Sequence, residues 1–203
     1  MRGIEAALKI LTTDQSTGAF ASEALRKLAD RESMKPTDIS LASSLVYIVM
    51  RRKELWESIS AKFLRTRDNL PPEVYMSIIM GTGGILELRR FSEGVLINGI
   101  LEYLKHDKDF VKYVSLVNAV LRKINEAGAE LTEAYKNSAA IEDKALYSGI
   151  PVWSMPAWLK TWSRQELALI FEMMLKPSYA TLRVTPGKLD DLTSLLDAKG
   201  IRY

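Results

Sequence analysis

The amino-acid sequence predicts a mainly α-helical protein, with a helical bundle over residues 1–148 and linker helices and a truncated α/β module over 149–203. Three observations lead to this prediction. Apolar residues recur every three or four positions through most of the chain, which is typical of amphipathic helices. Short polar connections with proline or glycine separate these segments. Near the C-terminus the period changes to two, which is typical of a strand.

The first three predicted helices form the front half of the bundle. The first carries Ile4, Ala7, Leu8 and Leu11, and the second, after a break at Ser16–Gly18, carries Phe20, Ala24, Leu25 and Leu28. The third begins near Thr37 or Asp38, either of which can cap it after Pro36, and continues toward Phe63.

Three further helices complete the predicted bundle. Pro71 and Pro72 suit the start of the fourth, and Ser92 with Glu93 opens the fifth. The sixth extends from near Asp109 to Glu126, with its apolar positions at Val114, Val117, Val120, Leu121 and Ile124. The stretch Glu130–Lys144 predicts a further helix, which gives a compact helical bundle with short connections.

The pattern changes around Gly149, Ile150 and Pro151. A tryptophan-rich helical stretch follows, and then Ala180, Leu182 and Val184 alternate with polar residues, which predicts a strand. Leu189, Leu192, Leu195 and Leu196 predict a helix, Gly200 is placed to end it, and Ile201 begins a second predicted strand. A β-α-β unit that stops there leaves a sheet edge uncovered, so we expect the chain to be a fragment of a longer protein.

Composition excludes several classes of site. No apolar run approaches the roughly 20 residues that cross a bilayer, so a cytoplasmic protein with no membrane partner is expected. Cysteine is absent and His106 is the single histidine, which argues against disulfides, Cys/His metal sites and Ser/His or Cys/His nucleophiles. No catalytic or metal-binding residue is therefore predicted, and His106 is expected on the surface at a helix end. A net charge of +3 and a pI near 9.0 are compatible with nucleic-acid binding.

Three strings in order resemble one family. Leu45–Arg51, with Leu55 following, is similar to a helix of NusB-like domains, although Trp56 stands where that helix usually has an acidic residue. Ile97 and Asn98, followed by Val117–Arg122, resemble a further helix pair of these domains, with Gly99 in place of the usual glutamate. Met155–Leu159, followed by Lys176, Pro177 and Leu182–Val184, looks like the linker and first strand of the RsmB (Sun/Fmu) ribosomal RNA cytosine-C5 methyltransferases, with Thr185 where asparagine is preferred.

This resemblance implies a NusB-like RNA-binding fold at the front of such a methyltransferase. Cytosine-C5 methylation in that family requires a cysteine nucleophile and a domain that binds S-adenosylmethionine. This chain has no cysteine and no strand leading into a glycine-rich loop, so we predict a non-catalytic chain without a cofactor, with S-adenosylmethionine bound only by a missing catalytic domain. Gly81–Gly84 lacks the lysine of a phosphate-binding loop and is interpreted as a helix break or a site of close helix packing.

Basic residues are the candidate RNA ligands, because cations on one edge can neutralise phosphates. The candidates are Arg2, Lys9, Arg51, Arg52, Lys53, Arg65, Arg67, Arg122, Lys123 and Arg183. Each of them could instead belong to a solvated helix face, and Arg122 and Lys123 could stabilise the end of the sixth helix. Trp153, Trp158 and Trp162 could stack on bases, although their apolar neighbours favour packing between modules.

The functional hypothesis is recruitment of ribosomal RNA. Basic helices would contact the RNA backbone and orient a hairpin toward a catalytic domain outside this chain. The alternative is a NusB-like protein interaction or transcription antitermination module that docks a ribosomal or transcription protein, with RNA secondary. Charge reversal of Arg51, Arg52 and Lys53 separates the two hypotheses, because it should abolish RNA binding and spare protein binding.

Overall fold

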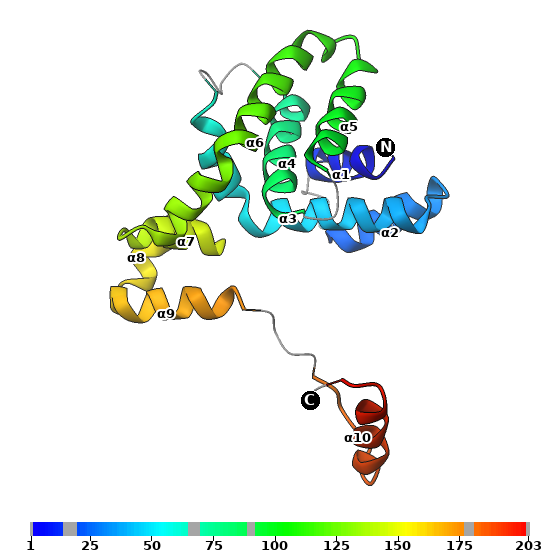
Figure 1. Cartoon of the computed structure of the whole chain (residues 1–203), viewed down its shortest axis with the longest axis vertical. Helices are drawn as coiled ribbons and strands as arrows, with labels where there is room; N and C mark the ends of the chain where they lie inside the picture. Colours follow the sequence, from blue (N-terminus) through cyan, green and yellow to red (C-terminus); the bar gives the residue numbers. More distant parts are fainter. Residues whose placement is uncertain (1, 14–19, 65–69, 89–91, 177–180, 202–203) are drawn as a thin grey trace.

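Six helices form a bundle in the first two thirds of the chain (Figure 1). The structure is a computed structural model, and it describes residues 2–13, 20–64, 70–88, 92–176 and 181–201. The bundle contains α1 (Arg2–Thr12), α2 (Ala21–Arg31), α3 (Pro36–Ala61), α4 (Pro72–Glu87), α5 (Glu93–Lys105) and α6 (Val114–Asn137), with the 3-10 turn η2 (Val111–Tyr113) before α6. The prediction of a mainly helical bundle is confirmed.

Helix α4 lies at the centre of the bundle, where it packs against α1, α3, α5 and α6. Its residues Ile78, Ile79 and Met80 are fully buried, which agrees with a helix that is apolar on nearly all sides. Trp56 of α3 is also fully buried, and its indole N–H donates to the carbonyl oxygen of Ile48 at 3.0 Å. The amphipathic outer helices therefore share one core built around α4.

The glycines of α4 lie inside the helix, which continues to Glu87. A Cβ atom built on Gly81 would lie 2.7 Å from Leu121 Cδ2, and one on Gly83 would lie 2.7 Å from Ile48 Cγ2. Close helix packing is therefore confirmed for this cluster, whereas a helix break is wrong. The cost of glycine in a helix is offset because the missing Cβ atoms let neighbouring side chains approach the α4 backbone.

Helix α6 is one continuous helix, whereas the sequence predicted one helix to Glu126 and another from Glu130. Gly128 lies between these predicted segments and is buried, and a Cβ atom there would lie 2.9 Å from Leu86 Cδ2. This glycine is thus a contact point with the end of α4. Packing on Leu86 holds the backbone helical at a residue whose own helix propensity is low.

Four short elements follow the bundle and have a smaller core of their own. They are α7 (Ile141–Ser148), η3 (Val152–Ser154), α8 (Met155–Trp158) and α9 (Arg164–Met174). Ile150, Met155, Leu167 and Phe171 are buried in this second core. Helix α7 also packs against α3 and α6, so it attaches these elements to the bundle.

The predicted α/β module is wrong for the described residues. Thr181–Val184 adopts no regular secondary structure and Ile201 lies in no strand, while Ala180 lies outside the described residues. The helix predicted there is present as α10 (Leu189–Ala198), with Gly200 at φ +64° just beyond its end, but it buries none of its residues. A strand needs a neighbouring strand to pair its backbone groups, and the described part of the chain supplies none. Figure 1 shows α10 apart from the bundle.

Candidate nucleic-acid interface

The basic run at the middle of α3 is divided by a kink at Arg52. This residue has non-helical backbone angles, φ −140° and ψ 36°, although the helix continues on both sides. Arg51 and Lys53 are exposed, whereas the side chain of Arg52 is only 14% exposed. The kink thus separates three consecutive cations into one that lies inside the structure and two that face solvent.

Arg52 connects three helices. Its Nη1 atom donates to Glu87 Oε1 at 2.8 Å, at the end of α4, and its guanidinium lies 4.8 Å from the ring centre of Tyr147 on α7. Burial raises the pKa of Glu87, while the charges of Arg52 and Arg51 act in the opposite direction. Arg52 Nε is buried without a hydrogen-bond partner within the described residues. These contacts give Arg52 a structural role, because Glu87 and Tyr147 already engage its guanidinium.

The turn after α7 packs against the α3 backbone at Arg51. Gly149, at φ +80°, ends α7 while the Gly149 N–H donates to Leu146 and the Ile150 N–H donates to Ala145, which is a Schellman motif. A Cβ atom on Gly149 would collide with the carbonyl oxygen of Arg51, so only glycine fits this contact. A cleft of about 140 Å³ lies here, lined by residues 50–55 of α3 together with Leu146 and residues 149–151.

Trp153 lies on η3, which directly follows this turn. The N–H of its neighbour Val152 donates to Glu54 Oε2 at 3.1 Å, which ties η3 to the residue that follows Lys53. Trp153 is 79% exposed, so the packing favoured for it by the sequence is wrong. Met155, two residues later, takes the buried position instead.

Of the other two tryptophans of this region, Trp158 packs as the sequence favoured, whereas Trp162 is 40% exposed. The Trp158 ring lies 5.5 Å from that of Trp162 and 5.9 Å from that of Phe171, between ring centres. Trp158 is partly buried against the second core. The Trp158 ring therefore links α8 to α9 through Phe171.

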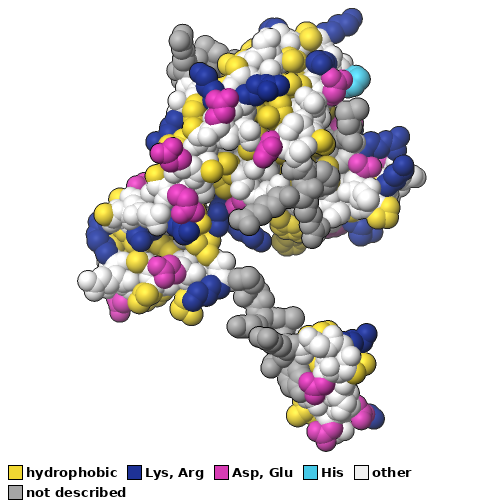
Figure 2. Space-filling view, in the orientation of Figure 1, with side chains coloured by type: hydrophobic (Ala, Val, Ile, Leu, Met, Phe, Trp, Pro, Cys, Tyr) yellow, Lys and Arg dark blue, Asp and Glu magenta, His cyan; other side chains and the backbone are white. Residues whose placement is uncertain are grey.

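Among the described residues, the remaining predicted cations lie on other elements than Arg51 and Lys53. Lys9 is paired with Glu5 at 2.9 Å and with Glu32 at 3.2 Å, which raises its pKa. Figure 2 shows acidic side chains among the Lys and Arg side chains on the visible face of the bundle. The exposed candidates Arg2, Arg122, Lys123 and Arg183 lie on α1, on α6 and before α10, and Arg122 donates to Asn118 at 3.0 Å. Arg65 and Arg67 lie outside the described residues.

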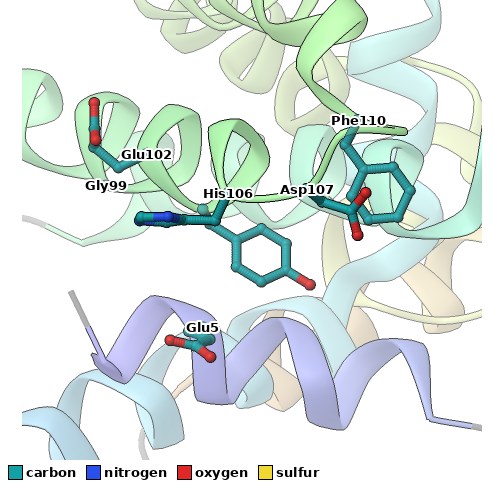
Figure 3. A pocket seen from close by; sticks show the side chains of 7 residues that line it. Glu5, Gly99, Glu102, His106, Asp107 and Phe110 are labelled. Atoms are coloured by element: carbon teal, nitrogen blue, oxygen red, sulfur yellow. The ribbon is translucent and has the colours of Figure 1, made fainter.

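A second hollow, of about 310 Å³, lies between α1 and the end of α5 (Figure 3). Glu5, Glu102 and Asp107 contribute carboxylates to it, and Tyr103 has a pKa raised mainly by burial and also by nearby acidic groups. His106 is exposed at the end of α5, as the sequence predicted. Three carboxylates make this hollow unsuitable for a phosphate backbone.

The described residues contain no helix that is long and apolar enough to cross a membrane. Over the same residues, no group of three or more His, Cys, Asp or Glu side chains is arranged to hold a metal ion.

Comparison with known families identifies the bundle. The NusB family model matches residues 4–126, which is more than half of the chain and includes α1 to α5 and the first half of α6. This chain belongs to the NusB family. No curated protein and no solved structure matches it. NusB family domains bind RNA and partner proteins, so the match indicates a function related to RNA binding or transcription antitermination.

The candidate interface lies partly inside and partly outside the residues that match the NusB family. Arg51 and Lys53 lie within the matched NusB residues, whereas Gly149 and Trp153 lie beyond them. The family match does not identify the methyltransferase type that the later strings resemble. The sequence had indicated Arg51 and Lys53, the two exposed cations beside the kink. It missed that Arg52 is held inside and that the turn before Trp153 packs on α3, because both depend on contacts between residues far apart in the chain.

Proposed function

We propose that this NusB domain binds ribosomal RNA through Arg51 and Lys53 of α3. The observation that carries the proposal is the kink at Arg52, which pairs the middle cation with Glu87 and leaves its two neighbours exposed. Neither neighbour forms an ion pair within the described part of the chain. Both are therefore available to phosphates, and each phosphate contact releases counterions from the RNA.

We further propose that this binding recruits RNA for cytosine-C5 methylation. Support comes from the resemblance of Met155–Leu159 and Leu182–Val184 to ribosomal RNA methyltransferases of the RsmB type. Because the chain has no cysteine, the nucleophile and the S-adenosylmethionine site would belong to a catalytic domain outside it. The role of this chain would be to position the RNA, and the interaction is expected in the cytoplasm.

The test is RNA affinity over a series of salt concentrations. The probe is a small-subunit ribosomal RNA hairpin, and the test variant is Arg51→Glu with Lys53→Glu. The matched control is Arg26→Glu with Lys27→Glu, two neighbouring cations of α2 that are paired with Asp30 at 3.5 Å and with Glu23 at 2.7 Å. If each α3 cation neutralises one phosphate, the salt dependence should become shallower in the test variant. The magnitude of the slope of log affinity against log salt should decrease by roughly 1.4.

Equal losses in the test and control variants would show a general charge effect and refute the α3 site. Retained RNA affinity in the α3 variant would instead favour the protein-docking alternative. The methylation step has a separate test. The codons for residues 1–148 are deleted from the gene in its host cell, and cytosine methylation of the ribosomal RNA is mapped by bisulfite sequencing. Unchanged methylation would refute recruitment.

A further inference from the structure

Trp153 differs from the other tryptophans in being mostly solvent-exposed. Trp56 is fully buried and hydrogen-bonded, and Trp158 and Trp162 lie against each other. Trp153 is 79% exposed, although a tryptophan side chain gains more from burial than almost any other. A ring left in water beside a basic segment is therefore a candidate for ligand contact rather than for packing.

The backbone that carries Trp153 is held on both sides. Before it, the Schellman motif at Gly149 fixes the turn, and Val152 is hydrogen-bonded to Glu54 on α3. After it, the Ser154 hydroxyl donates to the carbonyl oxygen of Pro151 at 2.7 Å, and Met155 is buried. An aromatic ring on such a fixed segment loses little conformational freedom when a ligand binds.

The same contacts hold the segment that carries Trp153 against the part of α3 that carries the cations. Val152, which directly precedes Trp153, is bonded to the residue that directly follows Lys53, and Gly149 touches the backbone of Arg51. Single-stranded nucleic acid is bound by this combination, in which a flat ring stacks on a base while cations contact the neighbouring phosphates. A double helix offers no unpaired base to such a ring.

We infer that Trp153 is a stacking platform for an unpaired base of the bound RNA, with Arg51 and Lys53 on the adjoining phosphates. This inference rests on the proposed function and adds to it the kind of RNA that is recognised. The RNA must present a single-stranded segment, such as a hairpin loop, at the junction between α3 and η3. The family match ends before Trp153, so this contact extends the interface beyond the NusB domain.

The experiment compares Trp153→Ala, Trp153→Phe and Phe20→Ala. Phe20 precedes α2 and is 78% exposed, which makes it a matched control for the loss of an exposed ring. Affinity is measured by fluorescence anisotropy for a labelled RNA hairpin and for a duplex of the same stem without a loop. Trp153→Ala should weaken hairpin binding about tenfold, whereas Trp153→Phe should stay within about twofold, because phenylalanine also stacks.

Four further results would make the loss specific to stacking. Duplex affinity should be unchanged by Trp153→Ala, and the salt slope should be unchanged because no charge is removed. Phe20→Ala should bind like the original chain. Quenching of tryptophan fluorescence by unlabelled hairpin should be present in the original chain and lost in Trp153→Phe, which keeps the other three tryptophans.

The outcomes separate this inference from the proposed function. Equal hairpin affinity of Trp153→Ala and Phe20→Ala, with weaker binding by the α3 charge variant, refutes stacking and leaves the phosphate site intact. Absence of RNA binding by the original chain refutes both. Thermal melting of each variant checks folding. If the alanine variant is unstable, the quenching comparison between the original chain and Trp153→Phe decides, and quenching retained in Trp153→Phe refutes stacking.

Discussion

Replacing Arg52 with methionine tests whether this cation supports the fold or binds RNA. Methionine keeps an unbranched apolar stem but removes the guanidinium, and with it the 2.8 Å contact to Glu87 and the approach to the Tyr147 ring. The substitution therefore removes the charged group that links α3 to α4 and α7. We expect a clear loss of stability, even though arginine is usually a surface residue.

The expected size of the loss follows from burial. The side chains of Arg52 and Glu87 are 14% and 26% exposed, so their pair lies between a surface ion pair, worth about 0–1 kcal/mol, and a buried one, whose disruption costs about 3–5 kcal/mol. We take about 2 kcal/mol for the pair and about 0.5–1 kcal/mol for the ring contact. The free energy of unfolding should thus fall by about 2–3 kcal/mol.

Urea unfolding followed by circular dichroism measures this loss. Arg51→Met is the matched control, since Arg51 is exposed one residue away, and its effect should stay within about 0.5 kcal/mol. A double-mutant cycle with Glu87→Gln isolates the pair and should give a coupling of about 1–2 kcal/mol. The reasoning is refuted if Arg52→Met costs less than about 0.5 kcal/mol and weakens RNA binding as strongly as Arg51→Met.

The remaining predictions concern the turn after α7 and the pH dependence of stability. Gly149→Ala should lower the free energy of unfolding by at least about 2 kcal/mol, because alanine is strained at positive φ and its Cβ atom would collide with the Arg51 carbonyl oxygen. A smaller loss, measured by urea unfolding, would contradict this contact. Burial raises the pKa of Glu87 above its ordinary 4.5, so the folded state binds this proton at a higher pH than the unfolded chain. The stability contributed by protonated Glu87 is therefore complete below pH 4.5 and is lost as pH rises through the pKa of the folded state. In a series of urea midpoints measured against pH, Glu87→Gln should abolish this decline.

The sequence alone determined the helices of the bundle. Periodicity placed the apolar faces of α1 to α6, as at Leu121 and Ile124 on α6, because a helix that buries one side must repeat its apolar residues every three or four positions. It also placed the helix end at Gly200, but at Gly81–Gly84 it left a helix break and close packing open, and only the fold decided for packing. Local patterns failed at Thr181–Val184, where the alternation was that of a strand but no pairing strand exists in the described residues.

Only the tertiary structure decided which basic and aromatic residues are available to a ligand. In the sequence, Arg51, Arg52 and Lys53 are three equivalent cations, and Trp153 is one of several tryptophans among apolar neighbours. In the fold, Glu87 and Tyr147 hold Arg52 inside, and the α7 turn places Trp153 in water beside the α3 kink. Exposure and ion pairing depend on residues distant in the chain, so they follow from packing and cannot be read from local sequence.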